Sequence, residues 1–333
     1  MDKEQFIPVI PRVKVYETKL LDKAKFERMI ESDTAQEALK VLQETEYANV
    51  MGDVKRAEDY EEILSSELTR VYDNLYRICP DTTLIEIMSL RYEYHNIKVL
   101  VKGKVAKKDF SNMLINLGST DTEKLKFAID NEAYRELDSF KKKSVEESIE
   151  DFNANNDPQN IDLIIDKYMF EEMVYLAKKI NENFVLKYVK SQIDLANIKT
   201  LLRVKKQDKS REFLQSVLIK GGEVSTDMLV LMLNDSAENI ASKLSYTRYG
   251  AILKEGIESY AKTGSVSLFE KLSDNFIMSL LKGAKIMTSG VEPIIAYIYA
   301  KENEIKLIRI IMVGKLNNIS AEVIRERLRD SYV

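Results

Sequence analysis

The stretch EYHNIKVL, residues 93–100, decides how this sequence is organised, because the chain contains it more than once. The stretch DLANIKTL, residues 194–201, repeats it closely, and KENEIKLI, residues 301–308, is a weaker copy. The lysines at the sixth position of the three copies are 101 and 107 residues apart, close to one third of the 333-residue chain. This spacing predicts one helical unit that occurs three times.

Shorter segments, which we call head modules, recur at an offset of 202 residues. Thr34–Glu37 has the pattern of a capping box, in which the first residue caps a helix and the glutamate reaches back. The module ends in Thr45-Glu46-Tyr47. At the offset, Ser236 replaces the cap and Thr247-Arg248-Tyr249 replaces the ending. A weaker copy, at an offset of 87, has its cap at residues 120–121 and keeps only Tyr134 of the ending.

Two longer helices are expected after each head module, and the second of them, the motif helix, carries the repeated stretch. We therefore divide the chain into units at 1–108, 109–215 and 216–333. Glycine adopts positive φ at low cost, so Gly103, Gly221-Gly222 and Gly314 are expected to stop the motif helices. Residues 319–329 are expected to form a short helix, as a truncated fourth head module that caps the repeat.

The composition favours an all-α protein. Hydrophobic residues make up 45% of the chain and charged residues 31%, while there are only five prolines and eleven glycines. The net charge of −4 argues against nucleic acid as the main partner, and one cysteine excludes an intramolecular disulfide framework. No apolar run approaches the roughly 20 residues that cross a bilayer, and no secretory signal is visible. We expect a soluble body of three similar helical subdomains.

The repeated stretch supplies a recurrent polar set with two readings. It could form a ring of equivalent contacts for a partner or ligand. The alternative, which we favour, is structural, with Asn bridging helices, Lys pairing with an acid one turn away and Ile anchoring the core. The residues of this set are Asn96, Ile97, Lys98, Asn197, Ile198, Lys199, Glu304, Ile305 and Lys306.

Basic residues gather where the motif helices end. Cations there complement the helix dipole, which is the structural explanation. If a threefold axis relates the units, the same residues would form a basic collar that faces an acidic partner or anionic lipid headgroups. These tips are Lys102, Lys104, Lys107, Lys108, Arg203, Lys205, Lys206, Lys209 and Arg211.

The sequence offers little that supports catalysis. His95 is the single histidine and lacks cysteine partners for a metal site. Cys79 lacks a histidine and acid set for nucleophilic catalysis. Gly221-Gly222 fits neither the Walker nor the Rossmann pattern. We predict no catalytic residue, no cofactor and no metal.

The order of these motifs resembles a known family, the C-type subunits of bacterial and archaeal V-type (A-type) ATPases and ATP synthases, which are the counterparts of the d-type subunit of the eukaryotic V-ATPase. The resemblance covers essentially the whole chain, and Lys14 is a mild departure because the family more often has arginine there. It rests on Arg12-Val13-Lys14 followed by Leu20-Leu21, on Thr45–Tyr47, on residues 95–100 and 197–199, and on residues 297–309 followed by Gly314.

The resemblance implies a funnel-like, all-helical protein with three subdomains around a pseudo-threefold axis. It also implies a non-catalytic rotor subunit on the cytoplasmic face of the membrane. Such a subunit links the central stalk, made of D-type and F-type subunits, to the membrane ring of proteolipid subunits, and transmits torque. Two alternatives remain at this point, a helical-repeat adaptor that binds another protein's helix and a helical enzyme with an unrecognised site.

Overall fold

The computed structural model describes residues 3–52, 54 and 56–333, and these residues form helices and no strand. The predicted all-α class is therefore confirmed. The chain divides into two compact units. Unit 1 is Glu86–Phe269, and unit 2 joins the described residues up to Ile85 with Glu270–Val333. The division into three units and their threefold arrangement stay predictions.

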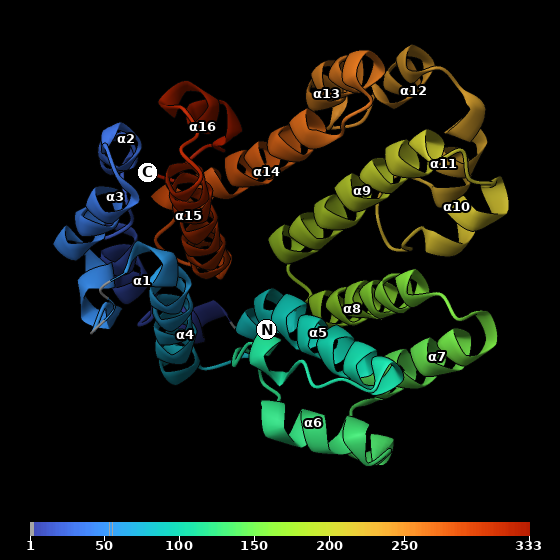
Figure 1. Ribbon diagram of the computed structural model, residues 1–333, viewed down its shortest axis with the longest axis horizontal. Helices are drawn as coiled ribbons and strands as arrows, with labels where there is room; N and C mark the ends of the chain where they lie inside the picture. The colour runs from blue at the N-terminus through green and yellow to red at the C-terminus, as the bar shows by residue number, and fades with distance from the viewer. Residues whose placement is uncertain (1–2, 53, 55) are drawn as a thin grey trace. The chain divides into compact units, whose positions relative to one another are not determined.

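Unit 2 is built around α15 (Glu292–Leu316), which is apolar on most of its sides. A helix that is apolar all round must be covered by neighbours. The helices that pack on α15 come from both ends of the chain, as Figure 1 shows for the blue and red segments. They are α1 (Ile10–Glu17), α2 (Lys23–Glu31), α3 (Ala35–Val41), α4 (Tyr60–Ile78) and α16 (Ala321–Arg327).

Unit 1 contains two further motif helices, α5 (Thr83–Ala106, from Glu86 onward) and α9 (Asn183–Lys206). A hairpin of α7 (Ser139–Asn155) and α8 (Pro158–Ile180) packs against α9 through α8. The remaining helices of the unit are shorter, and α14 (Ser267–Lys282) contains the boundary to unit 2. The shorter helices are α6 (Thr122–Asp130), α10 (Arg211–Val217), α11 (Thr226–Leu231), α12 (Ala237–Leu244) and α13 (Gly250–Thr263).

The predicted caps of the head modules are present. The Thr34 hydroxyl accepts from the Glu37 N–H at 3.2 Å, and the Glu37 carboxylate accepts from the N–H of Asp33 at 3.0 Å. Ser236 accepts from the N–H of Asn239, and Asp121 caps α6. Such side-chain acceptors satisfy the N–H groups that a helix leaves unpaired in its first turn.

Glycine does not end the motif helices, so this expectation is wrong. The residues with positive φ after α5, α9 and α15 are Lys107, Asp208 and Asn318, with φ of 53°, 51° and 53°. In each case the next N–H donates to the carbonyl five residues earlier, which closes the helix with a Schellman-type bond. Three non-glycine residues therefore adopt the left-handed conformation.

Gly103 and Gly314 instead lie inside α5 and α15, where another part of the chain approaches closely. A Cβ on Gly103 would lie 2.8 Å from the Lys108 carbonyl oxygen. A Cβ on Gly314 would lie 2.6 Å from side-chain atoms of Ile324 in α16. Neither glycine has a positive φ, and at both positions an added Cβ would force neighbouring atoms to shift.

Candidate functional site

Each motif helix carries one buried carboxylate that binds the backbone just before a short helix. Glu93 of α5 accepts from the N–H of Ser119 at 2.7 Å. Asp194 of α9 accepts from the N–H of Val224 at 3.0 Å, and Glu304 of α15 accepts from the N–H of Leu21 at 2.5 Å. The short helices that follow are α6, α11 and α2, which we call the head helices; α2 and α11 precede the predicted head modules, whose own helices are α3 and α12.

A lysine eleven residues after each acid binds the other end of the same head helix. Its ammonium group donates to a carbonyl oxygen at the C-terminal end, which complements the negative end of the helix dipole. Eleven residues are about three helical turns, so the acid and the lysine share one face of the motif helix. The pairs are Lys104 with Ile129 at 2.9 Å, Lys205 with Leu233, just after α11, at 2.9 Å, and Lys315 with Ser32 at 2.7 Å.

These contacts correct the register of the third copy. By its partners Glu304 corresponds to Glu93 and Asp194, and not to Asn96 and Asn197 as the sequence comparison suggested. The copy on α15 is therefore displaced by three residues, almost one helical turn. A shift of that size keeps the same face of the helix apolar, which explains why Ile305 aligned with Ile97 and Ile198 in the sequence.

The two asparagines make a separate, identical contact. The Asn96 amide donates to the carbonyl of Ile115 at 2.8 Å and accepts from its N–H at 2.9 Å. The Asn197 amide does the same with Ile219, at 2.7 and 2.8 Å. Each asparagine thus pairs with both backbone groups of one residue in the segment that leads to a head helix.

The rest of the repeat set also has its place within the units. Ile97, Ile198 and Ile305 are buried. Lys98 forms an ion pair with Asp166 of α8 at 2.5 Å, and Lys306 forms one with Asp274 of α14 at 2.5 Å. Lys199 is half-buried. The buried isoleucines agree with the structural interpretation, but the predicted pairing of the lysines with an acid one turn away is wrong for Lys98 and Lys306, whose partners lie on other helices.

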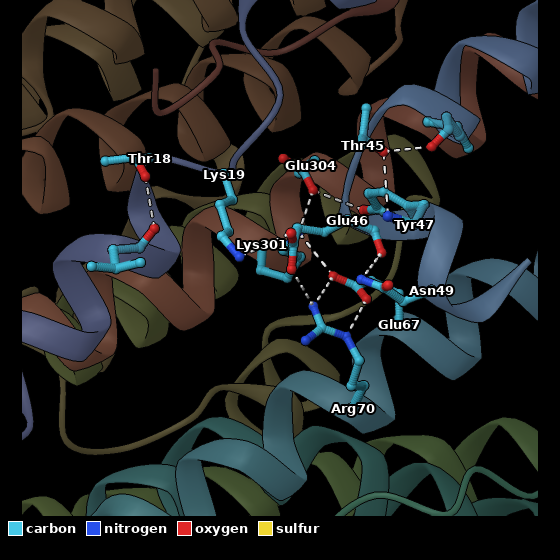
Figure 2. Close-up of polar contacts among 12 residues, drawn as sticks. Thr18, Lys19, Thr45, Glu46, Tyr47, Asn49, Glu67, Arg70, Lys301 and Glu304 are labelled. Carbon is cyan, nitrogen blue, oxygen red and sulfur yellow. Dashed lines mark hydrogen bonds and ion pairs between the residues drawn. The ribbon is translucent and has the colours of Figure 1, made fainter.

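Figure 2 shows the polar network around Lys301, which lies one turn before Glu304 on α15. Its side chain is 2% exposed, and its ammonium nitrogen lies 2.6 Å from Glu304 and 3.2 Å from Glu67 of α4. Arg70 holds the other side of Glu67 at 2.7 Å. Burial opposes the charged form, but the two carboxylates outweigh it and raise the pKa of Lys301.

Tyr47 connects the first head module to this network. Its hydroxyl donates to Glu304 at 2.8 Å, and the Lys301 ammonium lies 4.9 Å from the centre of its ring. The equivalent Tyr249 donates to Asp194 at 2.8 Å. In both endings the threonine two residues earlier accepts from the tyrosine N–H at 3.3 Å. The 202-residue offset therefore marks two modules with the same local geometry.

Asp194 is held differently from Glu304, because the residue one turn earlier is Ser191 and not a lysine. Ser191 is fully buried, and its hydroxyl accepts from Arg248 at 3.3 Å. Asp194 is held by the N–H groups of Glu223 and Val224 and by Tyr249. Burial raises the pKa of Asp194, although these donors act in the opposite direction.

Glu93 has no tyrosine of this kind, because Tyr134 lies half-buried over Lys104 and does not reach it. It is paired instead with the buried Lys141 of α7, at 3.2 Å. Lys141 also lies 3.3 Å from Glu172 of α8. Burial opposes the charge of Lys141, but the acids prevail and raise its pKa. By these contacts α6 corresponds to α2 and α11, and not to α3 and α12, so the head module predicted at an offset of 87 is wrong.

The head module that begins the chain belongs to the helix near its end. Leu21 and Tyr47 both bind Glu304 of α15, and Lys315 binds the end of α2. The short helix expected within residues 319–329 is present as α16, but its assignment as a fourth head module is wrong. α16 follows α15 as α10 follows α9, and both end at an extended leucine, Leu328 and Leu218.

The basic tips fall into two groups. Lys102, Lys104 and Lys205 are half-buried, and they bind Asp162 at 2.6 Å and two carbonyl oxygens at or just after the ends of head helices. The others are exposed at the surface. These exposed residues are Lys107, Lys108, Arg203, Lys206, Lys209 and Arg211.

Among the described residues no three His, Cys, Asp or Glu side chains are placed to hold a metal ion. The ring of His95 lies 3.1 Å from the carbonyl oxygen of Met113. Burial raises the pKa of Cys79 to about 12, which keeps this thiol protonated. Across the same residues no helix is both long and apolar enough to cross a membrane.

Sequence reasoning missed Lys301 and Lys141 as buried cations, and it missed the two-ended hold on the head helices. The contacts at both ends of the head helices had a signal in the sequence, because an acid and a lysine eleven residues apart occur in all three motif helices. The buried cations carry no such signal, since a lysine in a helical pattern is ordinarily solvated.

Comparison with known proteins shows the family of this chain. Residues 9–327 match the family model described as ATP synthase (C/AC39) subunit. The chain is 31% identical to the C-type subunit of the A-type ATP synthase of Methanocaldococcus jannaschii, over 98% of this chain and 87% of the relative. It is 30% identical to the C-type subunit of the V-type sodium ATPase of Enterococcus hirae, over 97% of both chains. The chain therefore belongs to the C/AC39 family of subunits of the V-type and A-type ATP synthases.

Proposed function

We propose that this chain is a non-catalytic rotor subunit, a socket between the central stalk and the membrane ring of a V-type or A-type ATPase. The observation that carries the proposal is its similarity, over nearly the whole chain, to subunits named for such complexes. We place it peripherally on the cytoplasmic face, with D-type and F-type stalk subunits and proteolipid ring subunits as its partners. It would transmit torque during ATP-coupled ion transport.

The contacts within each unit suit a part that must resist twisting. Every head helix is held at its start by a carboxylate and at its end by a lysine from the same motif helix. Buried polar networks that are fully paired restrict the packing to one arrangement. A head helix could therefore move relative to its motif helix only if these bonds broke.

The perturbed groups also support a non-catalytic role. Lys301 and Lys141 each face two buried carboxylates, and Asp194 faces backbone N–H groups and a tyrosine. Perturbed pKa values mark active sites only probabilistically, because structural ion pairs shift them as well. Lys301, Lys141 and Asp194 each have partners that join one helix to another segment of the fold.

Isolation of the complex tests the proposal. A tag on this chain and gentle detergent extraction from its native membranes should recover the stalk subunits, the ring and ATP hydrolysis together. Recovery of the chain with neither stalk nor ring would contradict the proposal. Recovery with one unrelated helical partner would favour the adaptor reading.

The exposed basic tips are proposed contacts with acidic surfaces of the partner subunits. Reversal of Lys206 and Lys209 to glutamate should lower the yield of assembled complex and leave circular dichroism unchanged. Lys205 is left intact, because it holds the Leu233 carbonyl and its loss would disturb the head helix. The control reverses Lys178 and Lys179, an exposed pair on α8. Equal yields from both double variants would contradict this role.

A further inference from the structure

The turn between α14 and α15 exposes apolar side chains that nothing above explains. Ile286 is 90% exposed and Met287 is 38% exposed. The turn, residues 282–287, contains a short 3-10 helix, Gly283–Ile286. A single exposed apolar side chain is ordinary, but neighbouring exposed apolar side chains rimmed by polar residues mark a contact with another surface.

Cations surround this apolar tip. Lys282 and Lys285 belong to the turn, and Lys14 of α1 donates to the carbonyls of Ala284 and Lys285, both at 3.0 Å. Burial lowers the pKa of Lys285, the charges of Lys282 and Lys14 lower it further, and Glu17, which lies 2.9 Å from Lys14, acts in the opposite direction. The whole chain carries a net charge of −4, so this basic site is local.

The helix joined to the turn continues the same character. Arg12 and Val15 of α1 lie three residues apart, on one face of the helix. Both are exposed, Val15 to 55%. Apolar and basic groups therefore alternate over two segments that Lys14 binds together.

We propose that this turn, with the exposed face of α1, rests on an anionic membrane surface. Ile286 and Met287 would enter the boundary between headgroups and acyl chains, while the lysines bind lipid phosphates. Lys14 is held by Glu17 and by two carbonyl oxygens, whereas Arg12 and Lys285 are exposed on two different segments. Exposed cations spread in this way suit a laterally uniform anionic surface better than a single carboxylate. The proposal rests on the proposed function, which brings the chain to a membrane.

The proposal also orients unit 2. The turn precedes the N-terminal end of α15, whereas Lys315 lies near its C-terminal end. A helix of 25 residues is roughly 37 Å long, so the two features are far apart. The N-terminal end of α15 then faces the membrane.

Vesicle sedimentation with the purified full chain tests this contact. Vesicles of phosphatidylcholine with about one third phosphatidylglycerol should bind the chain, and vesicles of phosphatidylcholine alone should bind it weakly. The double variant Lys282→Glu/Lys285→Glu should lower binding to the anionic vesicles by more than about tenfold. The variant Ile286→Ser/Met287→Ser should lower it several-fold without a change in charge.

The matched controls are Lys178→Glu/Lys179→Glu for charge and Leu231→Ser, at a side chain 65% exposed, for the apolar change. Both controls should bind vesicles as the unaltered chain does. Equal binding to the two vesicle types, or turn variants that bind like the controls, would overturn the proposal. Turn variants that keep vesicle binding but lose the ring on isolation would show an acidic protein as the occupant. Co-purification with stalk and ring is measured separately, so failure of the lipid contact stays distinguishable from failure of the rotor role.

Discussion

The buried acids of α15 and α9 do the same work with different partners. Glu304 and Asp194 each accept a backbone N–H that precedes a head helix and a hydroxyl from a Thr-x-Tyr ending. Beside Glu304 lies the buried Lys301, whereas beside Asp194 lies Ser191. One contact is therefore stabilised by an ion pair and the other by neutral donors.

This difference shows that both buried acids, Glu304 and Asp194, need hydrogen-bond donors, whereas only Glu304 has a buried cation beside it. Lys301 is needed on α15 because the carboxylates of Glu67 and Glu304 are both buried next to it. Asp194 is single and can be satisfied by N–H and O–H groups. Burying a charge is costly without a partner, so the cation accompanies the second acid.

Loss of the cation should give the largest effect. Lys301→Met leaves Glu67 and Glu304 close together and buried, and we expect unit 2 to lose about 3–5 kcal/mol of unfolding free energy. Ser191→Ala, the matched change on α9, should cost only about 1 kcal/mol. Urea unfolding followed by circular dichroism compares the two. Similar losses would break the distinction between the two networks.

Lys301→Met/Glu67→Gln is the rescue for that experiment. It removes one cation and one carboxylate, so the remaining acid faces Tyr47 and Leu21 much as Asp194 faces its donors. The double variant should recover part of the lost stability. A double variant less stable than Lys301→Met would mean that charge balance is not the reason for Lys301.

Crowding of the loop against Asp194 should give the next effect. A Cβ on Gly222 would overlap the Asp194 carboxylate, so Gly222→Ala should push the loop away and cost about 2–3 kcal/mol. Gly283→Ala is the control, because no atom lies within 4 Å of a Cβ built there. Thermal unfolding by calorimetry should show a lower transition for the first variant only.

Removal of either tyrosine hydroxyl should lower the unfolding free energy by a smaller amount, and the loss should be larger for Tyr249 than for Tyr47. Tyr249→Phe takes from Asp194 its one side-chain donor among the bonds described, and we expect a cost of about 2 kcal/mol. Tyr47→Phe should cost about 1 kcal/mol, because Lys301 still holds Glu304. Equal costs in urea unfolding would show that the lysine does not compensate for the hydroxyl.

Sequence alone predicted the parts of this comparison that depend on local chemistry. The Thr-x-Tyr endings at Tyr47 and Tyr249 share both their spacing and their bonds. The all-α class followed from the composition, which is poor in proline and glycine. The register on α15 was misplaced by three residues, because a helix repeats nearly every turn and several alignments keep the same buried face.

Other features could not be predicted from the sequence, for physical reasons. Glycine is the usual residue at positive φ, so nothing marked Lys107, Asp208 and Asn318. The order of modules along the chain suggested that each head belongs with the helices that follow it. Packing instead joins α2 and α3 to α15, because long-range contacts are not constrained by order in the sequence.

The smallest effect should appear at alkaline pH, as a change in how steeply the unfolding free energy falls with pH. The pKa of Tyr47 is raised by burial and then by Glu304, and the pKa of Lys301 is raised as well. Because these pKa values are higher in the folded state, the folded protein keeps the two protons to a higher pH than the unfolded chain does. Their stabilisation is complete below about pH 10 and is lost as the pH rises further.

Tyr47→Phe removes one of these protons, so it should flatten the fall in unfolding free energy above pH 10 by up to about 1.4 kcal/mol per pH unit. Tyr249→Phe should flatten it in the same direction, since burial and Asp194 raise the pKa of Tyr249. Tyr246→Phe, at a side chain 75% exposed, is the control and should leave the slope unchanged. Urea unfolding in buffers between about pH 9 and 11 measures the slopes. If Tyr47→Phe followed the control while Tyr249→Phe did not, Lys301 would hold the α15 network together even after the tyrosine ionises, and the two networks would differ in their response to pH as well as in their partners.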